Sequence, residues 1–411
     1  MSNKILNYFY AKIDNLRDKT KYYLKKTVKY HFFSIFAHVY YNRHLLFHNI
    51  MIMLRDKSWD FVKFFLMFFV VFGHICPAGE KWTPVTRIIG LFVIPGFFLV
   101  SGFFQSKIVD FRSLVKKFRK TIFRIVIPLI VWGGIYVFLS VLKLYKIPDI
   151  SCSDSVQEYV ENMVSFLKYT PFYIAGFYWF ITALLLCITF GSCMSFLITI
   201  RRSVGLFILG VSPLFFCILP YTLIELYHFS FVWLFYVAGM LFKELKDSLL
   251  DIEKNKYGNV ICFVMLLVAI CYGVNFYPEE TFYYTSNLFT ETQMIFIVKR
   301  YALYLTTVLV MLYWIRFFYN RFSKNKLITR FANYGQDTLF IYCSHMLFLD
   351  FLYKPFLLPV LYHVNGSLMM IICEHVVGLL ISVMLYVILQ YLCGICHKSK
   401  MASFFLLGLS Q

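Results

Sequence analysis

The chain has 411 residues, of which 60% are hydrophobic and 21% aromatic, and its net charge at pH 7 is +19. This apolar content exceeds that of ordinary soluble domains, which is about 45 to 50%. The 40 Lys and Arg residues lie mainly in short segments between apolar stretches, which indicates membrane topology and argues against a nucleic-acid-binding protein. The sequence therefore predicts an all-α, polytopic membrane protein.

Residues 1–58 form a basic, aromatic arm. Its first 20 residues are charged and have no apolar core, so no cleavable signal peptide is predicted. Between Val28 and Leu54, aromatic residues and Leu alternate with basic residues and His, a pattern that favours a helix lying on the inner membrane surface. An eleventh membrane segment is the alternative.

About ten apolar segments follow, each long enough to cross about 30 Å of hydrocarbon. The predicted membrane domain spans residues 59–395, and 396–411 form a short cytoplasmic tail. The segments are 59–77, 87–105, 122–142, 177–200, 204–220, 229–243, 259–277, 296–318, 337–358 and 368–395.

The distribution of Lys and Arg gives the orientation of these segments. With the N-terminus inside, 31 of the 40 basic residues face the cytoplasm and eight face outward, while Lys63 lies within a span. An excess of positive charge on the cytoplasmic side is the general rule for membrane proteins. We therefore expect a multi-pass protein of the inner (cytoplasmic) membrane with both termini inside.

The first apolar segment carries Asp60, Lys63 and His74 on one helical face. Eleven residues separate Lys63 from His74, which at 3.6 residues per turn places them on one side and about 16 Å apart. Asp60 lies one turn before Lys63 and can pair with it. Ionisable residues are costly in membrane spans, about 2.5 to 3.5 kcal/mol each, so this stripe predicts a functional site or channel.

Several segments resemble, in order, the motifs of the acyltransferase-3 family of integral membrane acyltransferases. The resemblance covers residues 55–395. Its strongest parts are the Lys63 and His74 pair with ten residues between them, the aromatic run 95–104 that contains Ser101 and Gly102, and the basic run 118–128. Weaker parts are 178–184, 235–239 and 334–345. Lys63 departs mildly from the family, in which Arg is commoner at that position.

The resemblance implies an O-acyltransferase that takes an acyl group from coenzyme A, with acetyl-CoA expected as the donor. The acceptor is expected to be a hydroxyl of a cell-surface polysaccharide or glycan precursor. No bound cofactor, metal or nucleic acid is expected, and the partners are the acyl-CoA, the glycan or glycolipid acceptor and membrane lipid. The alternative is a transporter or flippase of lipid-linked glycans, although no internal repeat of the transporter kind is visible.

The predicted catalytic residues are His74, Lys63 and Asp60. His74 is the expected base, because an imidazole takes up and returns a proton near neutral pH. Lys63 is too far from His74 to share its contacts. Two roles stay open for Lys63: it holds the donor, or Asp60 neutralises it structurally.

The predicted substrate-binding residues lie on several segments. Arg119 and Arg124 are expected to hold the phosphates of coenzyme A, with ordinary positive-inside residues as the alternative. For Ser101 and Gly102, helix packing or donor passage is favoured over a nucleophilic Ser.

Three further features complete the sequence-based expectations. His345 matches a family segment and is expected near the substrate. Trp179 is expected at an outer aromatic belt, with stacking on a sugar ring as the alternative. Residues 393–397 have the Cys-x-x-Cys-His spacing of covalent haem attachment, but their predicted cytoplasmic position makes a chance match the better interpretation.

Overall fold

A computed structural model describes residues 56–75, 83–146, 179–218, 224–244, 256–275, 291–351 and 368–408. The predicted N-terminal arm lies outside these residues except for its last three positions, so its interfacial or membrane-spanning character stays a prediction. Residues Lys57–Gln411 form one compact unit.

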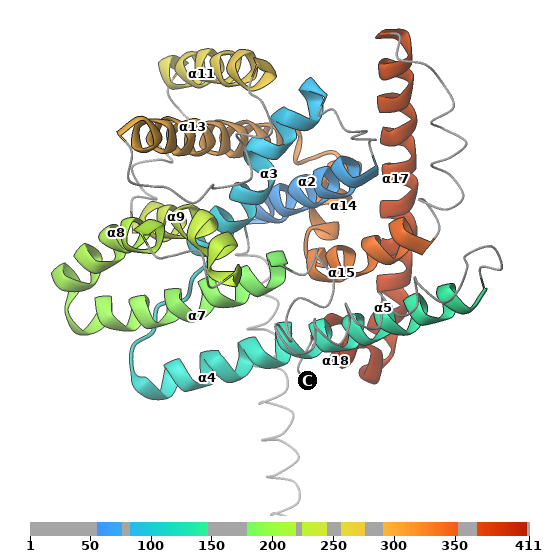
Figure 1. Cartoon of the computed structure of the whole chain (residues 1–411), viewed down its shortest axis with the longest axis horizontal. Coiled ribbons are helices and arrows are strands. Elements are labelled where there is room, and N and C mark those ends of the chain that lie inside the picture. Colours follow the sequence, from blue (N-terminus) through green and yellow to red (C-terminus); the bar gives the residue numbers. More distant parts are fainter. Residues whose placement is uncertain are drawn as a thin grey trace, which may run out of the picture. The chain divides into compact units, whose positions relative to one another are not determined.

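The described part of the chain contains helices and no strand (Figure 1). A π-helical turn at Ile122–Val126 joins two of these helices. In chain order the helices are α2 Lys57–Ile75, α3 Pro84–Phe103, α4 Phe111–Thr121, α5 Ile127–Lys146, α7 Trp179–Ile200, α8 Arg202–Ile218, α9 Ile224–Glu244, α11 Lys256–Asn275, α13 Glu291–Phe322, α14 Lys326–Tyr334, α15 Thr338–Phe348, α17 Leu368–Lys398 and α18 Lys400–Leu407.

Each predicted apolar segment overlaps one of these helices. Within the described ranges, six helices are long and apolar enough to cross a membrane, namely α2, α3, α7, α11, α13 and α17. Three shorter apolar stretches coincide with α8, α9 and α15. The all-helical membrane fold is thus confirmed, while ten spans and the inside position of both termini stay predictions.

Helix α2 packs against five other helices: α3, α13, α14, α15 and α17. Its apolar side chains are accordingly buried, with Val62, Leu66, Val71 and Ile75 all at 0% exposure. The helix that carries the predicted stripe of ionisable residues is therefore held on several sides. Small rotations of α2 would disturb all of these contacts.

Helices α3 and α9 approach each other at backbone distance. A Cβ atom on Gly102 would lie 2.0 Å from the carbonyl oxygen of Tyr236, and one on Gly239 would lie 2.0 Å from that of Leu99. Real Cβ atoms do not come so close, so both positions require Gly. Small residues allow this kind of close helix contact in membrane proteins.

The predicted inner loop between the second and third spans contains a helix that the sequence analysis missed. Helix α4 begins with a reciprocal capping box, in which the Asp110 carboxylate accepts from Ser113 N–H at 2.6 Å. Only Leu114 and Thr121 are buried, so α4 is amphipathic. The π-helical turn follows it and leads to Pro128, whose missing N–H interrupts regular α-helical bonding.

The predicted cytoplasmic tail also contains regular structure. Helix α18 begins at the N-cap Ser399 and ends at Gly408, which has a left-handed φ of 66°. Gly408 lies directly against the Arg124 carbonyl, where a Cβ would come within 2.3 Å. The Trp132 indole N–H donates to the Leu406 carbonyl at 3.2 Å, so α18 is fixed to α5.

We predict that Gly239→Ala destabilises the protein, because the new methyl group would collide with the α3 backbone. Overpacking of this kind costs about 1 to 3 kcal/mol. Thermal unfolding of the detergent-purified protein measures the effect. Gly210→Ala on α8 is the matched control, because nothing lies within 4 Å of its new Cβ. Equal melting temperatures for the two variants would contradict the close α3–α9 contact.

Candidate functional site

The predicted pair of Asp60 and Lys63 is present at the beginning of α2. Lys63 Nζ lies 2.8 Å from Asp60 Oδ1, and the Asp60 side chain is 2% exposed against 25% for Lys63. The Lys63 ammonium also lies 5.4 Å from the centre of the Phe104 ring, within the range of a cation–π contact. This geometry fits the structural alternative for Lys63, in which Asp60 neutralises its charge.

At the other end of α2, His74 lies beside His345 of α15. Their ring centroids are 5.5 Å apart. His74 is exposed, whereas His345 is fully buried at 0% exposure. The fold thus brings together two histidines that are 271 positions apart in the sequence, and we call them the histidine pair.

The hydrogen bonds of His345 define its tautomer. Nδ1 lies 2.6 Å from the carbonyl oxygen of Tyr342 and 3.1 Å from that of Ile341. A carbonyl only accepts hydrogen bonds, so Nδ1 carries a proton and donates it. In the neutral ring Nε2 then bears a lone pair. Within the described part of the chain, this buried Nε2 has no hydrogen-bond partner.

A third histidine lies near the same end of α2. His375, at the first turns of α17, has its Nε2 2.9 Å from the hydroxyl of Thr83, the N-cap residue of α3. Its ring centroid is 6.5 Å from that of Phe72 on α2. The Thr83 contact gives His375 a structural role in joining α17 to α3.

Ser101 and Gly102 lie near the end of α3 and make contacts of the packing kind, while their predicted part in substrate binding stays a prediction. The Ser101 hydroxyl donates to the Phe97 carbonyl of its own helix at 2.7 Å. Gly102 makes the close contact with α9 described above. Back-bonding of this kind is a common local arrangement of Ser in helices, so this contact gives no sign of an activated nucleophile.

Arg119 and Arg124 are both exposed at the end of α4 and in the π-helical turn that follows. Arg124 belongs to a group of positive charges that also contains Lys117, Lys120 and Lys243. Partial burial, followed by the charges of Lys120, Arg124 and Lys243, lowers the pKa of Lys117. The part of the shift that comes from the three neighbouring cations indicates a positive potential, which would attract an anionic ligand.

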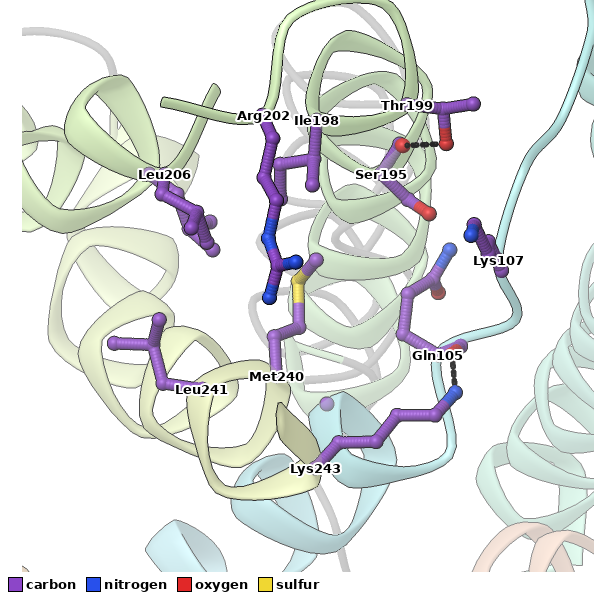
Figure 2. A pocket seen from close by; sticks show the side chains of 12 residues that line it. Gln105, Lys107, Ser195, Ile198, Thr199, Arg202, Leu206, Met240, Leu241 and Lys243 are labelled. Carbon is purple, nitrogen blue, oxygen red and sulfur yellow. Dashed lines mark hydrogen bonds between the residues drawn. The ribbon is translucent and has the colours of Figure 1, made fainter. Parts of the chain in front are cut away.

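A cavity of about 340 Å³ lies between the end of α3 and helices α7, α8 and α9 (Figure 2). Three cations line it, Lys107, Arg202 and Lys243, together with apolar side chains that include Met240 and Leu241. We call this cavity the basic pocket. Its combination of positive charge and apolar wall suits a ligand that carries both phosphate and apolar groups.

Buried polar side chains fix one wall of the basic pocket. The Gln105 amide donates to the Ser192 hydroxyl at 3.0 Å and accepts from the Tyr236 hydroxyl at 2.7 Å. Lys243 Nζ donates to the Gln105 carbonyl at 2.5 Å (Figure 2). In the sequence these residues are only isolated polar positions in or beside apolar segments, and none of them was predicted to line a pocket.

Trp179 begins α7 and is partly buried against Phe180, with ring centroids 6.2 Å apart and an interplanar angle of 84°. This edge-to-face contact is typical of aromatic packing. Stacking on a sugar ring therefore stays a prediction. Arg119, Arg124 and Trp179 are not among the described residues that line the basic pocket.

The chain is thus a helical membrane protein. Its largely buried helix α2 carries the Asp60–Lys63 ion pair and one member of the histidine pair. Residues 56–387 match a family model described as an acyltransferase domain. The chain belongs to this family, the acyltransferase-3 family that the sequence motifs resemble, and is a membrane acyltransferase. No curated protein and no solved structure matches the chain.

We predict that Asp60→Asn lowers the melting temperature, because the Lys63 ammonium loses its carboxylate. Breaking a buried pair costs about 3 to 5 kcal/mol, and the partial exposure of Lys63 places this case toward the lower end. The double variant Asp60→Asn/Lys63→Met removes both charges and should recover most of the lost stability. A double variant as unstable as Asp60→Asn would contradict a structural pairing. Recovered stability with lost activity would instead favour a donor-binding Lys63.

Proposed function

We propose that the chain is an O-acyltransferase of the inner membrane that transfers an acyl group, acetyl in the simplest case, from coenzyme A to a hydroxyl of a cell-surface polysaccharide or glycan precursor. The observation that carries this proposal is the histidine pair, an exposed imidazole beside a buried one in a chain of the acyltransferase family. Acyl transfer to a hydroxyl needs a base, which an imidazole supplies.

In the proposed reaction, His74 takes the proton of the acceptor hydroxyl while the hydroxyl oxygen attacks the thioester carbonyl of the donor. The new bond joins this oxygen to the acyl carbon, and the bond between the acyl carbon and sulfur breaks. Coenzyme A leaves as a thiolate and receives the proton from His74. The exposure of His74 supports this role, because an acceptor must reach the base.

His345 is proposed to position His74. Its Nδ1 proton is engaged by the carbonyls of Tyr342 and Ile341, so the lone pair of Nε2 is available to accept a hydrogen bond from an imidazole N–H. Such a bond would orient the base and stabilise the imidazolium that forms during the reaction, as the third member of a catalytic triad does.

The donor is proposed to approach from the cytoplasm. The basic pocket lies at the ends of α3, α7 and α9 and the start of α8, which the charge distribution predicts to face inward. Its cations and those of α4 are suited to the phosphates of coenzyme A. Arg119 and Arg124 would then attract the donor, and Arg202 and Lys243 would hold it.

We predict that His74→Ala abolishes acylation in cells. The measurement is the ester-linked acetyl content of purified surface glycans from cells that express the wild type, His74→Ala or neither, with membrane insertion checked in each. His375→Ala is the matched control, because its contact with Thr83 is structural. Acetyl that remains with His74→Ala would remove His74 from the mechanism. Unchanged acetyl content in all cells, with altered glycan export, would favour the transporter alternative.

We predict that the double variant Arg202→Gln/Lys243→Gln raises the KM for acetyl-CoA about tenfold or more with little change in kcat. Each lost hydrogen bond to a charged group is worth about 1.5 to 3 kcal/mol. The assay uses inside-out membrane vesicles, and Lys398→Gln at the end of α17 is the control for charge alone. A larger effect of Arg119→Gln/Arg124→Gln would place the donor phosphates at the end of α4 instead.

A further inference from the structure

Three side chains with metal-binding atoms meet where α17 ends beside the start of α15. They are Asp337, Cys393 and His397, and one ligand atom of each lies within 4.8 Å of the other two. His397 Nε2 is 3.1 Å from Asp337 Oδ1. Cys393 is buried at 0% exposure. We call this group the Asp-Cys-His cluster.

Helical spacing explains why two of the three residues face the same way. Cys393 and His397 are four residues apart on α17, so their side chains share one face, one turn apart. Two ligands at this spacing can hold one ion. From the sequence, residues 393–397 suggested only a chance match to haem attachment, and no metal was predicted. The third side chain, Asp337, is 56 positions away in the sequence, so local spacing does not reveal it.

The conformation of Asp337 supports an engagement outside its own helix. Asp337 occupies the N-cap position of α15, where an Asp carboxylate normally accepts a backbone N–H bond. Its side chain makes no such bond. Capping bonds stabilise a helix by about 1 kcal/mol. The Asp337 carboxylate does not make this capping bond and contacts His397 Nε2 instead.

The geometry points to a Zn²⁺ site: we propose that Asp337, Cys393 and His397 bind one zinc ion, with a water as the fourth ligand. Thiolate, imidazole and carboxylate together are a ligand set that Zn²⁺ accepts. With bonds of about 2.0 to 2.3 Å, tetrahedral ligands lie about 3.3 to 3.8 Å apart. The pair at 3.1 Å is close to this range, and the Cys393 sulfur lies within 4.8 Å of both other ligand atoms.

Metal binding is balanced by proton release. The Cys393 thiol loses its proton to solvent as the bond from sulfur to zinc forms, and His397 binds through an imidazole nitrogen that carries no proton, so an imidazolium at this position also releases its proton to solvent. The charge distribution predicts that this end of α17 faces the cytoplasm. In that reducing compartment, Cys393 stays a thiol that zinc can deprotonate.

The ion would fasten α17 to α15, the helix that carries His345. Helices α15 and α17 already pack against each other, and His397 of α17 contacts Asp337, the N-cap residue of α15. The Gln390 amide of α17 also donates to the carbonyl of Tyr334, at the end of α14, at 3.1 Å. His345 lies eight residues after Asp337 on the same helix, about 12 Å along its axis. Zinc binding therefore holds the helix of the histidine pair in place, independently of which acyl group or acceptor is used.

The test measures zinc bound by the full-length, detergent-purified protein after equilibration with Zn²⁺ and removal of the excess. We expect about one zinc per chain by mass spectrometry. His397→Lys is the informative variant, because a Lys ammonium keeps the ion pair with Asp337 and is a poor zinc ligand. Its zinc affinity should fall by at least the ~10- to 100-fold that loss of an outer-shell partner causes.

Cobalt gives a second readout that does not depend on activity. Co²⁺ bound to a thiolate has an intense charge-transfer band, which we expect in the wild type and not in Cys393→Ser. Cys187→Ser is the matched control, because Cys187 is equally buried but lies on α7. Its variant should keep both the zinc and the band. Zinc content that is negligible in the wild type, or unchanged in His397→Lys, would overturn the proposal and leave a simple ion pair.

Discussion

The protein depends on one constraint: ionisable side chains placed inside apolar helices must find partners within the protein. Asp60 and Lys63 meet this constraint through their ion pair on α2. His345 meets it through the backbone carbonyls of its own helix. Because charged and polar groups are expensive to bury, these contacts within α2 and within α15 fix the conformations of the Asp60, Lys63 and His345 side chains. The packing of α2 against α15 then places the His345 ring beside that of His74.

Close backbone packing supplies the rigidity that such a site needs. Gly102 and Gly239 let α3 and α9 touch, and Gly335 lies against the Asp60 carbonyl of α2, where a Cβ would come within 1.8 Å. These contacts determine the positions of α3 and α2, and thereby of the basic pocket and the histidine pair. A catalytic group must be held to within about 0.5 Å of its working geometry. Small residues at helix crossings achieve this in a fold without disulfide bonds among its described cysteines.

The sequence was sufficient for features that depend on local pattern. Apolar runs located the membrane helices, and helical periodicity placed Asp60 beside Lys63. The joint order of the motifs indicated the family that residues 56–387 match. Helix α4 was not predicted, because its few apolar residues lie among many basic residues, a composition that is typical of a cytoplasmic loop. Its capping residues, Asp110 and Ser113, were the signal that would have located it.

Features that depend on tertiary packing could not be obtained from the sequence. The contact between His74 and His345 requires the relative rotation of α2 and α15, which no local pattern specifies. The basic pocket combines Lys107, Arg202 and Lys243 from three separate segments. Each of these residues, seen alone, is an ordinary positive-inside residue. The sequence could therefore nominate His345 as a site residue without showing that it is the neighbour of His74.

We propose that His74 and His345 act as a unit in acyl transfer. The most direct test is the rate of transfer from acetyl-CoA in proteoliposomes for His74→Ala, His345→Asn and the double variant. Asn at position 345 can still donate to the backbone carbonyls but has no atom in the place of Nε2. Residues that act together give non-additive losses, so the double variant should be no slower than His74→Ala alone. If the fold-reductions in rate of the two single variants multiply in the double variant, the two histidines act independently, and the proposal that they act as a unit is wrong.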